Sequence, residues 1–227
     1  EALSTLFVDR TQVTLSGARA GEIIRFTLDG SEPNGMSPVA QGAVTLDRSC
    51  TLSARIFEGE IPRSATSLRE FTKVMPQTPV TRALGPTPGL RATFSTRDRF
   101  EKLADIDGAK VVGSLVVPPL SLDQRPRKEH FAIVFEGLLR VPRDGVWRLG
   151  LESDDGARLL IGGRVVVDID GLHVATRRDA EVALAEGWHA IRVEYFNAGG
   201  DSALRMDWEG PGQSRTEIPV EMFGWTP

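Results

Sequence analysis

The sequence lacks the features that define several classes of protein. Its 227 residues include one cysteine, Cys50, so no disulfide can form within the chain, and we expect its stability to come from buried cores. No apolar run approaches the ~18 residues of a membrane-spanning helix, and no signal peptide is evident, so we expect no insertion into a membrane. The net charge is -4 and Lys and Arg form no basic block, which argues against a nucleic-acid partner.

Helical periodicity is also nearly absent, and short alternating runs bounded by Gly, Pro, Asp and Asn take its place. Such runs are typical of an all-β protein. In "SCTLSARIF" the apolar residues alternate from Cys50 onward, which predicts a strand in which this thiol is a small buried filler. In "GVWRLGLES", Trp147, Leu149 and Leu151 share a face, and Gly162-Gly163 between two apolar runs predicts a two-residue hairpin turn.

Composition divides the chain into two β-sandwich domains in tandem. Residues 1–74 carry about seven short strand patterns, which favour an immunoglobulin-like sandwich. Residues 75–89, "MPQTPVTRALGPTPG", are rich in proline and predict a semi-rigid linker. Residues 90–227 hold longer strand patterns and predict a second, larger sandwich. The chain begins with Glu1 and no methionine, from which we expect a processed protein or a fragment of a larger one.

The first block resembles the small sandwich at the C-terminal end of chitobiases and β-hexosaminidases. The residues that carry the likeness are "FTLDGSEPNGMSP", "VTL" and "CTLSARIFEG". The resemblance implies an accessory module without chemistry of its own, of a kind that accompanies carbohydrate-active and other extracytoplasmic proteins.

The second block resembles the protective-antigen-type β-sandwich family, which is also found in glycosidases and adhesins. The likeness runs from "PGLRATF" through "HFAIVFEGLLRVPRDGVWRLGLESDDGARLLIGGRVVVD" and "LAEGWHAIRVEYFNAGGDSALRMDWEGPG" to "IPVEMF". One departure is Gly162, where members often carry Asp in the hairpin turn.

No catalytic residues are predicted. The three histidines, His130, His173 and His189, stand in no nucleophile elbow and in no metal-ligand spacing. A glycosidase would need two carboxylates about 5–10 Å apart in a cleft, and both blocks are already assigned to accessory-type sandwiches. We therefore expect the chain not to be an enzyme, although its parent protein can be a carbohydrate-active one.

The adjacent carboxylates of "ESDDGARLLIGG" admit two interpretations. Asp-Gly is a strong turn signal, so Asp154 and Asp155 can simply end a strand at a solvated hairpin turn. Alternatively, the pair can hold one ion. Neighbouring side chains on a trans extended chain point to opposite faces, whereas a cis peptide bond brings the two Cα atoms to about 2.9 Å.

The family resemblance supports the second interpretation. In the adhesin branch, two consecutive aspartates joined by a cis peptide bind Ca²⁺, which in turn coordinates sugar hydroxyls. That resemblance implies metal ligands at Asp154 and Asp155, a side-chain ligand at Asn197, and carbonyl ligands at Gly199 and Asp201 in "YFNAGGDSAL". Ca²⁺ prefers several hard oxygen ligands of this kind.

A sugar would also need contacts from a neighbouring loop. The candidate is "GLHVATRR", residues 171–178, in which His173 and Arg177 are the expected ligand-binding residues. No exposed aromatic platform is evident, because three tryptophans lie in strand patterns and Trp225 is expected to cap a sandwich edge.

These observations lead to one functional hypothesis and two alternatives. The hypothesis is a non-catalytic carbohydrate-binding or adhesion segment of a larger extracytoplasmic protein, whether secreted, periplasmic or at the cell surface, with a glycan as partner and Ca²⁺ as cofactor. In the first alternative, both modules are ligand-free and position a catalytic domain, such as a glycoside hydrolase, that lies outside this chain. In the second, the segment docks to another protein, which would require an exposed apolar patch that the sequence does not show.

Overall fold

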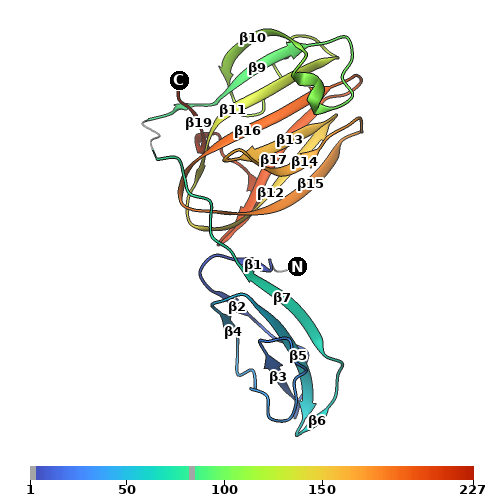
Figure 1. The fold of residues 1–227 in the computed structure, drawn as a ribbon, viewed down its shortest axis with the longest axis vertical. Coiled ribbons are helices and arrows are strands. Elements are labelled where there is room, and N and C mark those ends of the chain that lie inside the picture. The colour runs from blue at the N-terminus through green and yellow to red at the C-terminus, as the bar shows by residue number, and fades with distance from the viewer. Residues whose placement is uncertain (1–3, 82–84) are drawn as a thin grey trace. The chain divides into compact units, whose positions relative to one another are not determined.

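The computed structural model describes residues 4–81 and 85–227, and the chain divides into two compact units (Figure 1). The first unit ends at Met75 and the second runs from Pro76 to Pro227. The regular elements of both units are nearly all strands, as expected for an all-β protein. None of the helices in the described ranges is long and apolar enough to cross a membrane.

The first unit is a small sandwich of short strands. Strand β7 lies between β1 and β5, β3 pairs with the other edge of β5, and β6 adds to β5; β2 and β4 form a separate pair. The strands are β1 (Leu6–Phe7), β2 (Thr11–Val13), β3 (Ile23–Thr27), β4 (Val44–Leu46), β5 (Cys50–Glu58), β6 (Ile61–Pro62) and β7 (Ser67–Lys73). The core takes side chains from both sheets: Phe7, Val13, Val44, Leu46, Leu52 and Phe71. Cys50 packs against this core half-buried, and burial raises the pKa of its thiol.

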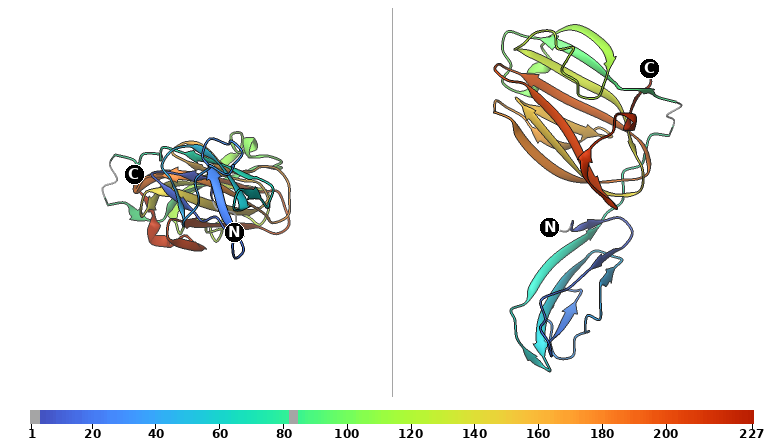
Figure 2. Two further views of the ribbon diagram at one scale, coloured as in Figure 1. Left: turned by 90° about the horizontal axis from the view of Figure 1, so that it is seen from below. Right: turned by 180° about the vertical axis from the view of Figure 1, so that it is seen from behind.

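The second unit is a larger sandwich, which Figures 1 and 2 show as two layers of strands. One sheet has the order β10-β9-β11-β16-β13-β14, with β19 beside β11 and β8 beside β19; the other has the order β15-β12-β17-β18. The strands are β8 (Thr87–Pro88), β9 (Leu90–Thr96), β10 (Lys110–Val117), β11 (Phe131–Val141), β12 (Gly145–Asp154), β13 (Ala157–Ile161), β14 (Arg164–Ile169), β15 (Thr176–Leu184), β16 (Gly187–Asn197), β17 (Ala203–Gly210), β18 (Gln213–Glu217) and β19 (Phe223–Trp225). Two short 3-10 helices, Leu103–Ile106 and Val220–Met222, complete it.

The core of the second unit lies between its two sheets and follows the predicted alternation. Trp147, Leu149 and Leu151 of β12 are fully buried, and Trp208 of β17 packs on Trp147 with ring centroids 4.6 Å apart. His189 of β16 is buried too, and its Nε2 lies 2.8 Å from the carbonyl oxygen of Ala185. The alternating patterns therefore correctly identified which face of these strands is buried.

The expected hairpin at Gly162-Gly163 is confirmed. Ile161 of β13 pairs with Arg164 of β14, which leaves two residues in the loop. Gly162 has φ 57° and Gly163 has φ 76°, and both lie in the left-handed region that a type I′ turn requires.

The proline-rich segment pairs with the second unit. The backbone N–H of Gln77 donates to Ala183 over 2.8 Å, and the N–H of Val80 donates to Trp188 over 2.7 Å. Farther on, β8 pairs with β19. The described part of the expected linker, residues 75–81 and 85–89, is thus counted with the second unit from Pro76 onward.

Candidate functional site

The aspartate pair lies where the chain passes from one sheet to the other. Asp154 ends β12, which pairs with β15 and β17, and Ala157 begins β13, which pairs with β14 and β16. The interpretation of Asp155-Gly156 as a hairpin turn is therefore wrong, because the strands on either side belong to different sheets. The peptide bond between Asp154 and Asp155 is cis, as the family resemblance implied.

Asp155 is a buried carboxylate that holds two loops. Its Oδ1 accepts a hydrogen bond of 3.1 Å from the backbone N–H of His173, and its Oδ2 accepts one of 2.8 Å from the N–H of Ala198. Only 7% of Asp155 is exposed. These two bonds bring together the loop after β14 and the loop after β16, which are far apart in sequence.

Asp154 is half-buried beside it. Burial, and then the charge of Asp155, raise the pKa of the Asp154 carboxyl above its ordinary value. The backbone oxygen of Asp154 accepts a 2.5 Å hydrogen bond from the hydroxyl of Tyr195. Burial, and then the charge of Asp154, raise the pKa of that tyrosine well above its usual range. Tyr195 is the one tyrosine of the chain, and no sequence pattern marked it as part of the site.

Asn197 reaches the site from the end of β16 and is fully buried. Its Nδ2 donates to the carbonyl oxygen of Asp201 over 2.6 Å and to that of Gly199 over 3.5 Å. Its Oδ1 is buried without a hydrogen-bond partner. Such an orphaned polar atom is rare in a folded protein and needs a reason. The structure thus brings together the three residues that the sequence placed in the late loop.

Gly156 allows the chain to pass close to the end of β16. A Cβ at this position would lie 2.4 Å from a ring carbon of Phe196 and 3.1 Å from the backbone nitrogen of Gly171. The backbone oxygen of Gly156 also accepts a 3.0 Å hydrogen bond from the N–H of Phe196. A side chain here would therefore push the aspartate pair away from Asn197.

The two predicted sugar-binding residues, His173 and Arg177, have different surroundings. The ring nitrogens of His173 lie 2.9 Å from the carbonyl oxygen of Val174 and 3.0 Å from that of Ile169, so the ring is held within its own loop. Arg177 projects from β15, where its guanidinium pairs with Asp207 over 2.7 Å and with Asp179 over 2.9 Å. The hydrogen bond to Asp207 is the largest cause of a raised pKa of Arg177.

The site offers oxygen atoms and few charged ligands. Within residues 4–81 and 85–227, no three His, Cys, Asp or Glu side chains converge in a metal-binding arrangement. Any ion here would take two carboxylates and complete its shell with amide and carbonyl oxygens. Such a set of hard oxygens suits Ca²⁺ better than a metal that prefers nitrogen or sulfur.

Comparison with known families and structures bears out both resemblances. Residues 86–222 match the family model of the PA14 domain, and residues 4–68 match that of the Chitobiase/beta-hexosaminidase C-terminal domain. None of the curated proteins matches this chain.

Solved structures share the fold at low sequence identity. A PA14 sugar-binding domain from RTX adhesin has a TM-score of 0.53 at 16% identity, over 62% of this chain and 99% of its own. The Epithelial Adhesin 6 A domain from Candida glabrata, solved with Galb1-3GlcNAc, has a TM-score of 0.52 at 13% identity, over 63% and 89%. An anti-sigma factor domain-containing protein from Clostridium clariflavum has a TM-score of 0.51 at 15% identity, over 96% and 84%.

Proposed function

The chain belongs to the PA14 domain family through residues 86–222, and we propose that it is a carbohydrate-binding module that uses a bound calcium ion. Two of the similar structures are a sugar-binding domain of an adhesin and an adhesin domain solved with a disaccharide. Because both are adhesin domains, they support an extracytoplasmic location for this chain. There it would be a non-catalytic, carbohydrate-binding segment of a larger protein.

The observation that carries the proposal is the set of oxygens at the sheet crossover. The carboxylates of Asp154 and Asp155 meet the buried end of β16, where the Oδ1 of Asn197 has no partner. The carbonyl oxygens of Gly199 and Asp201 lie within 3.5 Å and 2.6 Å of the same amide group. A half rotation of that amide exchanges its oxygen and nitrogen, so Asn197 can present an oxygen beside those carbonyls.

The raised pKa of Asp154 is consistent with a cation-binding role. A carboxylate that is partly buried next to a second one is unfavourable in its ionised form, and a nearby cation relieves this cost. When bound, Ca²⁺ would supply positive charge and coordination positions that adjacent sugar hydroxyls can fill. Asp155 would keep the surrounding loops in place through its bonds to the N–H groups of His173 and Ala198.

The loop after β14 is suited to contact the sugar itself. Leu172 and Val174 flank His173, and these two residues are 55% and 80% exposed. Apolar side chains of this kind can cover the C–H face of a sugar while the ion takes its hydroxyls. Arg177 stays a predicted contact, although its guanidinium already has two carboxylate partners.

A ligand-free structural role is the second candidate, and one observation favours it. Both carboxylate oxygens of Asp155 already accept backbone hydrogen bonds, which can hold the two loops together without an ion. In that case the aspartate pair would be a structural joint between the sheets.

Calcium-dependent stability distinguishes the two candidates. The melting temperature of the full chain is measured with excess Ca²⁺ and with chelator, where an ion at a hundred times its Kd adds about 2.7 kcal/mol to the folded state. We expect this gain to disappear in Asn197→Ala and to persist in Asp98→Asn, which removes an exposed carboxylate elsewhere. Equal melting temperatures with Ca²⁺ and with chelator would leave only the structural role.

Sugar binding is tested separately on a glycan array. The chain is applied with Ca²⁺, with chelator, and as the double variant Asp154→Ala/Asp155→Ala. We expect binding only in the first condition. Calcium-dependent stability without any glycan bound would retain the ion site and overturn its carbohydrate role.

A further inference from the structure

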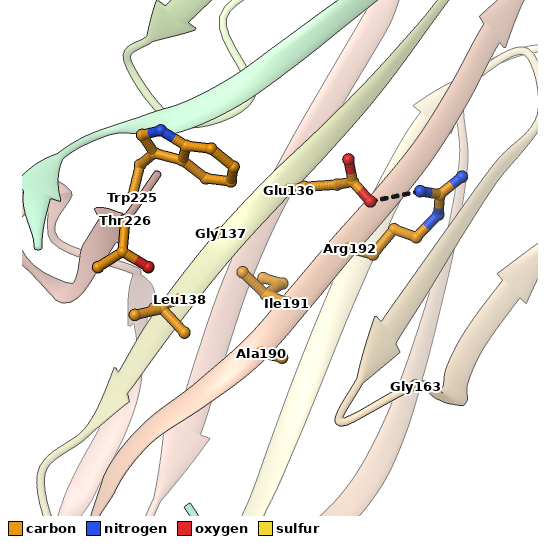
Figure 3. Close-up of a pocket in the computed structure, with 9 residues that line it drawn as sticks. All are labelled: Glu136, Gly137, Leu138, Gly163, Ala190, Ile191, Arg192, Trp225 and Thr226. Carbon is orange, nitrogen blue, oxygen red and sulfur yellow. Dashed lines mark hydrogen bonds and ion pairs between the residues drawn. The ribbon is translucent and has the colours of Figure 1, made fainter. Parts of the chain in front are cut away.

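A cavity of the larger unit lies on the outer face of its main sheet, and neither Asp154 nor Asp155 lines it (Figure 3). It has a volume of about 390 Å³, within the usual range for small-ligand pockets. Strands β11 and β16 form its floor, and the β13–β14 turn and the end of β19 border it. Its lining residues are Glu136, Gly137, Leu138, Gly163, Ala190, Ile191, Arg192, Trp225 and Thr226.

An aromatic side chain forms one wall. Trp225 is half-buried at the end of β19, and Figure 3 shows its indole directed across Gly137 toward Glu136. The guanidinium carbon of Arg91 lies 5.4 Å from the centre of the ring, which helps to fix its orientation. The face of an indole carries negative partial charge and attracts the C–H groups of a ligand.

Two charged side chains form the opposite wall and neutralise each other. Arg192 Nη1 lies 2.5 Å from a carboxylate oxygen of Glu136, and Arg192 also donates to Glu194 over 2.8 Å. Glu136 and Arg192 are the only charged residues among those lining this cavity. Glu194 also lies 3.6 Å from Arg158, so this wall offers hydrogen-bond donors and acceptors side by side without an excess of either charge. Neither an anion nor a cation is favoured, whereas a neutral ligand rich in hydroxyl groups is.

A peptide strand is a poor fit for the cavity. The floor strands are paired on both sides, β11 with β16 and with β9 or β19, and β16 with β11 and β13. They therefore leave no edge to which an extended peptide could add. The lining includes the small residues Gly163 and Ala190, which leave room for a compact ligand.

We propose that this cavity is a second carbohydrate site, which binds one neutral pyranose unit against Trp225 and Glu136–Arg192 without a metal ion. Arg192 precedes Asn197 by five residues on β16 (192 to 197), which is roughly 17 Å along an extended strand. The two sites therefore share no ligand residue, and this proposal does not depend on the calcium site.

The test follows the indole N–H signal of Trp225 and the backbone amides of Ala190 and Arg192 by NMR in the full chain. Cellotriose, triacetylchitotriose and β-lactose are titrated separately to roughly 10 mM, in chelator. At least one is expected to shift these signals to saturation. If none of the three shifts them, the proposal is overturned.

Variants separate this site from the first one. Ala190→Leu fills the cavity at an exposed position, and Trp225→Ala removes its aromatic wall; each should weaken binding by about tenfold or more. Ala190→Leu keeps the test valid if Trp225→Ala fails to fold. Asp154→Asn should leave the affinity within about twofold. Binding that disappears in Asp154→Asn, or that is unchanged in Ala190→Leu, would show that the sugar binds elsewhere and overturn the proposal.

Discussion

Asp154 is the residue whose protonation state should matter most to the site. Its pKa is raised by burial and by Asp155, so its ionised form is less favourable in the folded chain than in the unfolded one. A carboxyl with a raised folded pKa lowers stability at pH values above that pKa. This cost in stability disappears as the pH falls from the raised pKa of the folded state toward the ordinary value of 3.8.

Replacing this carboxylate should therefore have opposite effects with and without calcium. In chelator at neutral pH, we expect Asp154→Asn to melt at a higher temperature than the natural chain, because the cost of burying the charge and the repulsion from Asp155 are both gone. In excess Ca²⁺ we expect it to melt at a lower temperature, because a ligand is lost. The advantage in chelator should shrink as the pH approaches about 4. Circular-dichroism melts at two pH values measure this, and a variant less stable in both conditions would contradict it.

Gly156 is the residue that sets how closely the crossover approaches β16. We expect Gly156→Ala to lower the free energy of unfolding by about 1–3 kcal/mol, because the added methyl group meets the ring of Phe196. Gly199→Ala is a matched control in the same site, since a Cβ there meets nothing closer than 4.0 Å. Urea denaturation measures both variants. Similar losses in the two would mean that the lost backbone freedom of glycine, not the Phe196 contact, governs the effect.

At the scale of elements, the ends of strands build the site. β12 ends at Asp154 and β16 ends at Asn197, and the loops after β14 and β16 are tied to Asp155. The interiors of the same strands fill the core with Trp147, Trp208 and their neighbours. Rigid strands thus hold the proposed ligands, while the loops supply carbonyl oxygens and exposed side chains.

The β13–β14 hairpin offers a prediction at this scale. Gly162→Asn should change stability by less than about 1 kcal/mol, because asparagine tolerates the left-handed conformation, and only the flexible end of Gln77 is near. Gly163→Val should cost about 1–2 kcal/mol or more, because a β-branched residue at φ 76° is strained. Chemical denaturation compares the two, and equal costs would contradict a type I′ turn.

The whole molecule consists of two units whose boundary lies before the proline-rich segment. A fragment of residues 76–227 keeps the hydrogen bonds of Gln77 and Val80 to the strands of the second unit, and a fragment of residues 90–227 loses them together with β8. We expect the shorter fragment to be less stable by about 2–4 kcal/mol, because it loses the N–H bonds of Gln77 and Val80, the bond from Ala185 N–H to the Gln77 carbonyl, and the pairing of β8 with β19.

The same fragments locate the effect of calcium. Excess Ca²⁺ should raise the melting temperature of fragment 76–227. In the full chain it should raise the melting temperature of the second unit by the same amount, and it should leave the melting temperature of residues 1–75 unchanged. Differential scanning calorimetry of the three proteins checks both expectations. Equal stability of fragments 76–227 and 90–227 would support the interpretation of residues 75–89 as a linker.

The sequence by itself determined the all-β class, the two-module organisation and the buried faces of the strands, because period-two alternation and turn residues are local signals. It also indicated the Gly162-Gly163 turn, whose backbone conformation only a few residue types adopt. Resemblance to a family pointed to Asp154, Asp155 and Asn197 together. Local turn chemistry alone favoured a hairpin at Asp155-Gly156, which the structure does not contain.

Only the tertiary structure decided what surrounds these residues. Contacts between distant segments put β12 and β13 in different sheets and join the Tyr195 hydroxyl to the backbone oxygen of Asp154. They also leave the side-chain oxygen of Asn197 without a hydrogen-bond partner. The same holds for the cavity that Trp225 lines with Glu136 and Arg192, which come from other strands. Sequence patterns report what one strand prefers, whereas a site is formed where several strands end or cross.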